Sequence, residues 1–245
     1  MSAPLRVAMW SGPRNISTAM MRAWENRGDT AVSDEPLYAH YLLKTGVPHP
    51  GRDEVLAAQS SDWREVVSVL TGPVPDGQAI WYQKHMTQHM LSDVPLEWLG
   101  GLHNCFLIRA PEAVVASFTH NRPDAALWEF GFEQQARIFD YVAARFGTPP
   151  VLDADDVLRD PEGMLRALCA RLGVEFSTRM LHWPAGLRAS DGVWAKHWYA
   201  AVERSTGFEP YRPRQPKLTA FQARLAEQCR PFYARLHQHR ITAAS

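Results

Sequence analysis

Short apolar runs alternate along the chain with longer segments in which apolar residues recur at helical spacing. We predict strands from the apolar runs at residues 5–10, 30–33, 79–83, 105–108 and 149–152. Helical spacing predicts helices at residues 17–27, 63–70, 112–120, 129–146, 161–172 and 217–239. Short strands that alternate with helices are typical of an α/β fold, in which a short parallel sheet is covered by helices on both faces.

The stretch between residues 39 and 70 follows this pattern less clearly. Its Pro, Gly and His content predicts loops over a surface rather than a core element, with a loop at 46–52. No repeat, linker or composition break divides the chain. We therefore expect one domain over residues 1–245, with a core at about 5–176 and a C-terminal loop and helix, 177–245, packed on that core.

Composition and charge narrow the possible partners. The chain has 245 residues, of which 46% are hydrophobic, and its 26 basic side chains balance 26 acidic ones. This composition excludes a disordered chain, and the zero net charge gives no overall attraction to nucleic acid or to a membrane. Arginine greatly outnumbers lysine, and its planar group suits bidentate binding of phosphate or carboxylate. We expect a small-molecule partner, with no nucleic acid and no membrane.

The cysteines and the N-terminal segment indicate the compartment. The three cysteines are odd in number and lack the spacing of a metal site, so we predict buried free thiols, a reducing environment and no metal. The first residues lack the apolar core and cleavage site of a signal peptide, and no apolar run is long enough to span a bilayer. These features predict a cytoplasmic protein.

The first candidate site follows the first predicted strand. In an open parallel sheet, ligands lie beyond the carboxyl ends of the strands. The candidate binding residues in this loop are Gly12, Pro13, Arg14, Asn15, Ser17 and Thr18. A strand, this loop and a helix place backbone N–H groups, two hydroxyls and a guanidinium at a helix N-terminus, where anions are favoured. The structural alternative is a plain Ser/Thr cap of the helix.

A second candidate anion site follows the fourth predicted strand. Arg109 comes directly after that strand, and Ser117 lies about two turns along a helix that begins near Pro111. Both side chains can therefore reach one anion. Read alone, Arg109 is equally consistent with an ordinary surface arginine.

Together these segments resemble the family of sulfotransferases that use 3′-phosphoadenosine 5′-phosphosulfate (PAPS). The family's first motif, P-[KR]-S-G-[ST]-[ST], is similar to residues 13–18, and its second, R-x-P-x-x-x-x-x-S, is matched by Arg109, Pro111 and Ser117. The acidic turn and helix at 151–174 also resemble a family segment. The resemblance covers about residues 5–176 and implies a P-loop-like, three-layer fold.

The resemblance implies a role for each matched residue. Arg14 would hold the sulfuryl group and the bridging oxygen, and Asn15, Ser17 and Thr18 would bind the 5′-phosphate with nearby backbone amides. Arg109 and Ser117 would bind the 3′-phosphate, and 3′-phosphoadenosine 5′-phosphate (PAP) would be the product. Ile16 stands where the family usually has glycine. A β-branched residue rarely adopts a positive φ, so the loop must turn elsewhere or already be helical there.

Sulfuryl transfer needs cations near the leaving oxygen and a base for the acceptor proton. The resemblance implies that His85 is this base, because Gln83-Lys84-His85-Met86 is similar to the family's K-T-H-L-P segment. His89 and Glu35 are the alternative bases, and Lys84 would stabilise the leaving phosphate. The structural alternatives are a buried structural histidine and a surface lysine.

A basic, glycine-containing loop closes over the donor in family members. Arg188 and Lys196, within residues 186–198, stand near the corresponding point of this chain. The structural alternative for this segment is a surface loop packed by its aromatic residues.

Three other functions remain open. A P-loop nucleotide phosphotransferase needs a lysine in the phosphate loop and a strand-end aspartate for magnesium, and neither stands at the required spacing. A pyridoxal-phosphate transaminase needs a Schiff-base lysine, for which Lys84 is the strand-end candidate. A non-catalytic member of the fold would bind the nucleotide without transferring a group.

Overall fold

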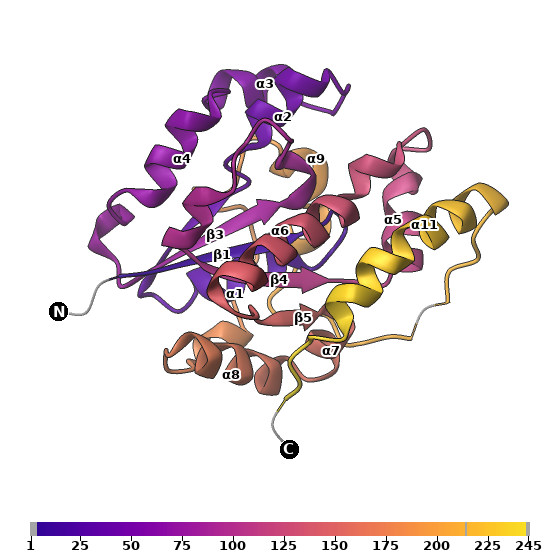
Figure 1. The fold of residues 1–245 in the computed structure, drawn as a ribbon. Coiled ribbons are helices and arrows are strands. Elements are labelled where there is room, and N and C mark those ends of the chain that lie inside the picture. Colours follow the sequence, from indigo (N-terminus) through magenta and orange to yellow (C-terminus); the bar gives the residue numbers. More distant parts are fainter. Residues whose placement is uncertain (1–3, 214, 244–245) are drawn as a thin grey trace.

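The computed structural model describes residues 4–213 and 215–243, and these contain a parallel sheet with helices on both faces (Figure 1). The strands run in the order β2-β3-β1-β4-β5, and each neighbouring pair is parallel. Their bounds are β1 Leu5–Ser11, β2 Thr30–Asp34, β3 Ile80–Met86, β4 His103–Ile108 and β5 Val151–Asp153. The predicted α/β fold with a short, covered parallel sheet is confirmed.

Helices connect the strands and continue beyond them. Their bounds are α1 Ser17–Glu25, α2 Tyr38–Thr45, α3 Arg52–Ala58, α4 Trp63–Thr71, α5 Pro111–Asn121, α6 Phe132–Phe146, α7 Ala154–Arg159, α8 Pro161–Leu172, α9 Ala195–Trp198, α10 Ala200–Glu203 and α11 Ala220–His237. Short 3₁₀ turns lie at Pro75–Gly77, Thr87–His89, Glu97–Gly101, Leu127–Phe130 and Thr178–Leu181. Most of the predicted helices are present within two or three residues of their predicted ends.

The alternation of side chains along the strands builds two hydrophobic cores, one on each face of the sheet. Val7 and Met9 point to one face, where helices α1 and α8 pack. Ala8 and Trp10 point to the other face, where α4 and α6 pack. Cysteines 105, 169 and 229 are buried and free, as predicted.

Helices α2 and α3 occupy a stretch for which loops over a surface were predicted. That prediction was wrong, because α2 is largely buried: Tyr38, Tyr41 and Leu42 form a third core with Trp194 and Tyr199. The partners that cover α2 come from a segment far along the chain. The local pattern of residues 39–70 therefore does not reveal their burial.

Strand β3 extends three residues beyond its predicted end. It pairs with β1 on one side and β2 on the other, and all of its residues are buried. Lys84 and His85 thus lie within the strand instead of following it. Since successive side chains of a strand point to opposite faces, these two residues are directed to opposite sides of the sheet.

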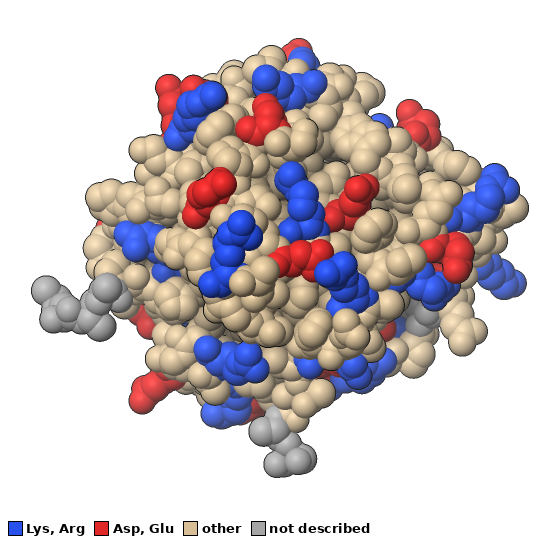
Figure 2. Space-filling view, in the orientation of Figure 1, with Lys and Arg blue, Asp and Glu red and all other residues tan. Residues whose placement is uncertain are grey.

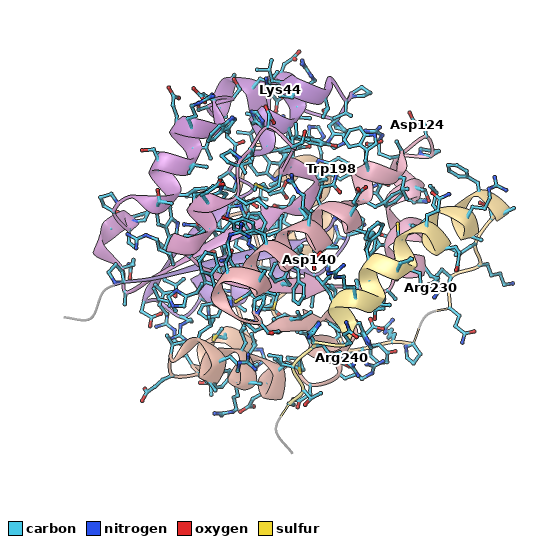
Figure 3. All side chains as sticks on the ribbon, in the orientation of Figure 1. Lys44, Asp124, Asp140, Trp198, Arg230 and Arg240 are labelled. Carbon is cyan, nitrogen blue, oxygen red and sulfur yellow. The ribbon has the colours of Figure 1, made fainter. Side chains whose placement is uncertain are left out.

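The C-terminal helix α11 packs across α5 and α6 (Figure 1), and ion pairs fix both the helix and the segment that follows it. Arg230 pairs with Glu112 of α5, Arg235 with Asp140 of α6, and Arg240 with Asp156 of α7. Arg230, Arg240 and Asp140 are labelled in Figure 3. Beyond the helix, the backbone N–H of Ile241 donates to the carbonyl of Val151 at 2.8 Å. The chain therefore pairs with the outer edge of β5.

The surface carries both signs of charge. In Figure 2 basic and acidic side chains are interspersed over the visible face, so this face of the described chain shows no broad basic stripe of the kind that follows a nucleic-acid backbone. None of the helices in the described part of the chain combines the length and the apolar character that a bilayer crossing needs.

Candidate functional site

A cavity of about 950 Å³ lies at the carboxyl edge of the sheet. The segments after all five strands contribute to its wall, as expected for a parallel sheet. Residues that line it from these segments are Pro13, Arg14, Asn15, Ser17, Thr18, Glu35, Met86, Gln88, His89, Arg109, Ala110 and Asp155. The cavity therefore brings together candidates that are up to a hundred residues apart.

The loop after β1 turns at Arg14 instead of at residue 16. Arg14 has a φ of 56°, a conformation that is uncommon for residues other than glycine. Ile16, with φ −57° and ψ 25°, caps α1 and offers no side-chain hydrogen bond to the helix. The plain Ser/Thr cap is thus absent, since Ser17 and Thr18 lie inside the first turn. The backbone N–H of Ser17 donates to the carbonyl of Asn15, so the N–H groups available to a ligand at the cavity wall are those that follow it in the first turn of α1.

Two residues fix this loop against its neighbours. A Cβ atom on Gly12 would lie 2.9 Å from the carbonyl oxygen of Phe130, which is too close for a real side chain. The Asn15 amide donates to the carbonyl of Leu107 on β4 at 2.8 Å. Gly12 itself is not among the residues that line the cavity. Its place in the loop is explained by this close backbone approach.

Arg14, Arg109 and Ser117 meet at one wall of the cavity. The Arg14 Nε donates to the Ser117 hydroxyl at 2.9 Å, and the Arg109 Nη1 donates to the backbone carbonyl of Arg14 at 2.7 Å. Ser117 lies on α5 about two turns from Pro111, where the sequence placed it. Arg14 thus joins the two strand ends through its guanidinium on Ser117 and its carbonyl on Arg109, and two guanidinium groups at one wall suit a bound anion.

Lys84 is buried, with 1% of its side chain exposed. Its ammonium donates to Asp34 and to the Tyr199 hydroxyl, both at 2.8 Å, and also to Glu35. Burial acts to lower the pKa of Lys84, but the attraction of the Asp34 and Glu35 carboxylates outweighs it and raises the pKa well above its usual value. Lys84 is therefore a charged residue fixed in the cavity wall and not a surface lysine.

Glu35 combines three features in the same wall. It lines the cavity, its φ is 43°, and burial together with the negative charge of Asp34 raises the pKa of its carboxyl despite the nearby Lys84. Among the described residues other than glycine, only Arg14, Glu35 and Asp76 have a positive φ. Two of these three strained residues line one cavity, which is a pattern common at functional sites.

His85 is placed away from the cavity, on the opposite face of β3. Its ring stacks on Trp10 with centroids 4.2 Å apart, and its Nε2 lies 3.3 Å from the Gln83 amide oxygen. Burial lowers the pKa of His85 to about 3. His85 therefore lies within the strand and does not follow it as expected from sequence, and it is not among the residues that line the cavity. His89 does line the cavity and stacks on Tyr38.

Arg188 and Lys196 also lie outside the residues that line the cavity. Arg188 pairs with Glu25 of α1, and Lys196 pairs with Glu54 of α3 at the surface. These pairs tie the 186–198 segment to α1 and α3. Donor binding by Arg188 and Lys196 stays a prediction, and neither side chain is part of the described cavity wall.

Sequence reasoning missed several residues of the cavity wall. Those with polar or aromatic groups include Tyr38, His49, His120, Trp198, Tyr199, Tyr211, Arg212 and Gln215. Trp198 is labelled in Figure 3. The basic segment that reaches the cavity is the proline-rich YRPRQP stretch, of which residue 214 lies outside the described residues. Its alternating arginines and prolines are the signal in the sequence, but they do not show whether the stretch packs on the core or reaches a ligand.

Comparison with known proteins decides the family. A family model described as a sulfotransferase domain matches residues 5–240, which is nearly the whole chain. The chain belongs to this sulfotransferase family. The resemblance carried by the motifs at Pro13–Thr18 and Arg109–Ser117 is thereby confirmed at the level of the family.

Solved sulfotransferase domains share the fold. The sulfotransferase from Alicyclobacillus acidocaldarius is 13% identical, with a TM-score of 0.55 over 98% of each chain. The sulfotransferase domain of the Synechococcus PCC 7002 olefin synthase is 19% identical, with a TM-score of 0.52 over 93% of this chain and 95% of that one. At these identities the likeness is one of fold.

Two curated relatives carry a different kind of name. Branched-chain-amino-acid aminotransferase-like proteins 1 and 2 of Arabidopsis thaliana are 38% and 36% identical to this chain, over 98% and 94% of its length. The sulfotransferase chain spans only 43% and 41% of those proteins. Their name therefore describes molecules more than twice as long, and it is not carried over to this chain.

Proposed function

We propose that this sulfotransferase-family chain moves a sulfuryl group from PAPS to a small-molecule acceptor and releases PAP. The observation that carries the proposal is the meeting of Arg14, Arg109 and Ser117 beside the uncapped N-terminus of α1. A donor with a 5′-phosphosulfate and a 3′-phosphate needs two anion subsites. The loop at residues 13–18 and the pair Arg109–Ser117 supply one subsite each.

Each subsite has its own ligands in this proposal. Arg109 and Ser117 bind the 3′-phosphate, and Ser17, Thr18 and the first amides of α1 bind the 5′-phosphate. Asn15 fixes the loop through Leu107. Arg14 lies between the two subsites, because its backbone turns in the 5′ loop while its side chain reaches Ser117.

The transfer step needs no covalent enzyme intermediate. The acceptor oxygen attacks sulfur as the bond between sulfur and the bridging oxygen breaks, and the electron pair of that bond leaves with the phosphate. Arg14 offsets the charge that develops on the leaving oxygen. Glu35 takes the acceptor proton, and Lys84 holds the Glu35 carboxylate in place.

Glu35 is preferred as the base because it satisfies both geometry and proton affinity. It lines the cavity, and its raised pKa brings its proton affinity closer to that of a base that works near neutral pH. His89 also lines the cavity, but burial lowers its pKa well below the usual value for histidine. The depressed pKa makes His89 a weaker proton acceptor than an ordinary histidine.

A titration of the protein with PAP, against ADP as the control, tests the donor part of the proposal. We expect PAP to bind with micromolar affinity and ADP to bind far more weakly, since only PAP carries the 3′-phosphate that Arg109 and Ser117 would hold. Equal affinity for the two nucleotides would overturn the two-anion site. Tighter binding of ATP with magnesium than of PAPS would favour a phosphotransferase instead.

The environment of Lys84 argues against a Schiff base with pyridoxal phosphate. Formation of a Schiff base requires a neutral amine, whereas two carboxylates raise the pKa of Lys84 and hold it as an ammonium. Its three N–H groups are all donated within the wall, to Asp34, Glu35 and Tyr199. An absorbance scan after incubation with pyridoxal phosphate is expected to show no internal aldimine.

A further inference from the structure

The cavity has two chemically different sides, which follow the strand order of the sheet. We call the segments after β1 and β4, with Arg14 and Arg109, the donor side. We call the segments at the ends of β2 and β3, with Glu35, Tyr38 and Lys84, the acceptor side. The donor side is cationic. The acceptor side contains two carboxylates, Asp34 and Glu35, against the single ammonium of Lys84.

The ammonium of Lys84 has no proton left for a ligand. A lysine carries three N–H donors, and all three are given to Asp34, Glu35 and Tyr199. The Tyr199 hydroxyl in turn donates to Asp34, whose second oxygen also accepts the backbone N–H of Gly192 at 3.2 Å. Glu35 is the member of this network that lines the cavity as a hydrogen-bond acceptor.

Tyr38 supplies a second acceptor through a buried chain of side chains. The Tyr38 hydroxyl lies 2.8 Å from the Nδ1 of His49, and the Nε2 of His49 lies 3.7 Å from the Glu129 carboxylate. Because a carboxylate faces Nε2, we assign the imidazole proton to Nε2, so that Nδ1 accepts the Tyr38 proton. The phenol oxygen of Tyr38, which the Trp198 side chain also faces, then keeps a lone pair for a ligand.

Aromatic side chains of the cavity wall also suit a cationic ligand. The rings of Tyr38, Trp198 and Tyr199 line the same cavity, and aromatic faces attract cations. The acceptor side therefore offers hydrogen-bond acceptors, excess negative charge and aromatic faces together.

We infer that the acceptor substrate is an alcohol that also carries an ammonium group: the ammonium binds against the Tyr38 oxygen and the aromatic rings beside it, and the hydroxyl lies at the Glu35 carboxylate, which takes its proton. The nucleophilic hydroxyl then points toward the donor side. This inference rests on the proposed sulfuryl transfer, whose acceptor class it names. A neutral diol leaves the excess negative charge unbalanced, and a hydroxy acid adds a third carboxylate to the same wall.

Matched ligands test the inference without relying on turnover. Linear amino alcohols of three to six carbons are titrated into the protein with and without PAP, beside diols and hydroxy acids of the same length. We expect the best amino alcohol to bind about ten-fold or more tightly than its matched diol, and the hydroxy acid to bind more weakly than both. Equal affinity for the amino alcohol and the diol at every length would overturn the inference.

Two tyrosine variants locate the effect. Tyr38→Phe removes the acceptor oxygen and is expected to abolish most of the preference for the amino alcohol. Tyr41→Phe is the matched control, because the Tyr41 hydroxyl is buried without a hydrogen-bond partner in the described chain and does not line the cavity. A preference that survives Tyr38→Phe unchanged would overturn the role of Tyr38.

The two proposals fail in different ways. Loss of the ammonium preference while PAP still binds more tightly than ADP contradicts only the acceptor class. Equal binding of PAP and ADP contradicts the donor site, and the titrations without PAP then still measure whether the cavity prefers an ammonium.

Discussion

The donor side and the acceptor side of the cavity are built by different kinds of contact. The donor side comes from two strand–loop–helix units: each anion ligand lies within nine residues of the strand that positions it, and Arg14 joins the two units through Ser117 and Arg109. The acceptor side depends on long-range partners: Lys84 meets Tyr199, and Asp34 meets the backbone of Gly192. The donor side thus depends mainly on the backbone geometry of each strand–helix unit, whereas the acceptor side forms only when the C-terminal half packs on α2. Substitutions on the two sides are therefore expected to fail differently.

Replacement of Glu35 by Gln gives the largest expected effect on the chemical step. Loss of the base is expected to lower kcat by about 10²- to 10⁴-fold, with PAP affinity unchanged. Because burial and Asp34 raise the pKa of Glu35 above its usual 4.5, kcat of the parent should rise with pH through a limb that lies above that value. The limb should vanish in the variant. Steady-state rates as a function of pH measure both effects, and an unchanged kcat would contradict the assignment.

Replacement of Lys84 by Met should destabilise the fold around the acceptor side. It leaves Asp34 and Glu35 buried without their cation, so we expect the free energy of unfolding to fall by about 3–5 kcal/mol. Denaturant unfolding followed by circular dichroism measures this loss. Lys196→Met is the control: its exposed pair with Glu54 should contribute at most about 1 kcal/mol. Equal stability of the two variants would show that the Lys84 network does not support the fold.

Replacement of Arg109 by Ala should weaken nucleotide binding on the donor side. We expect PAP to bind more weakly by about 2–5 kcal/mol, since a bound phosphate loses its paired charge. Arg188→Ala serves as the control, because Arg188 pairs with Glu25 outside the cavity wall. Calorimetry with PAP should separate the two variants. Equal affinities would mean that Arg109 does not bind the donor.

Replacement of His85 by Phe should have the smallest effect on catalysis. The ring that stacks on Trp10 is kept, and we expect kcat to stay unchanged because His85 lies away from the cavity. The depressed pKa of about 3 means that the unfolded chain binds a proton at His85 that the fold excludes, so stability falls as pH drops from about 6.5 toward 3. Unfolding curves over this range should show a weaker pH dependence in the variant. A large loss of kcat would restore His85 as the base.

Much of the fold and of the donor side could be predicted from the sequence, because both depend on short-range order. Hydrophobic periodicity located the strands and most of the helices, and the spacing of Arg109 and Ser117 placed both on one strand–helix unit. The turn at Arg14 was not predicted. Ile16 excluded a positive φ at its own position, but nothing local showed which neighbour would adopt it.

The acceptor side could not be predicted because the groups that neutralise and cover its charged side chains are distant from them in sequence. Lys84 and His85 look like residues that follow a strand, since a lysine rarely lies in a central strand. The Asp34 carboxylate and the Tyr199 hydroxyl make burial of Lys84 possible, and strand alternation then turns His85 away from the cavity. Arg188 and Lys196 looked suited to an anion for the same reason: their acidic partners, Glu25 and Glu54, are distant in sequence.

The pairing of Ile241 with β5 has a consequence for behaviour in concentrated solution. β5 is the last strand of the sheet, and an open edge strand is a template on which a second molecule can add its own strand. The bond from Ile241 to Val151 and the adjoining bridge between Val151 and Arg240 occupy that edge. The segment after α11 therefore blocks addition of a strand from a second molecule. A chain that ends before Arg240 would expose the edge of β5 and favour edge-to-edge aggregation, while the residues of the cavity wall would be unchanged.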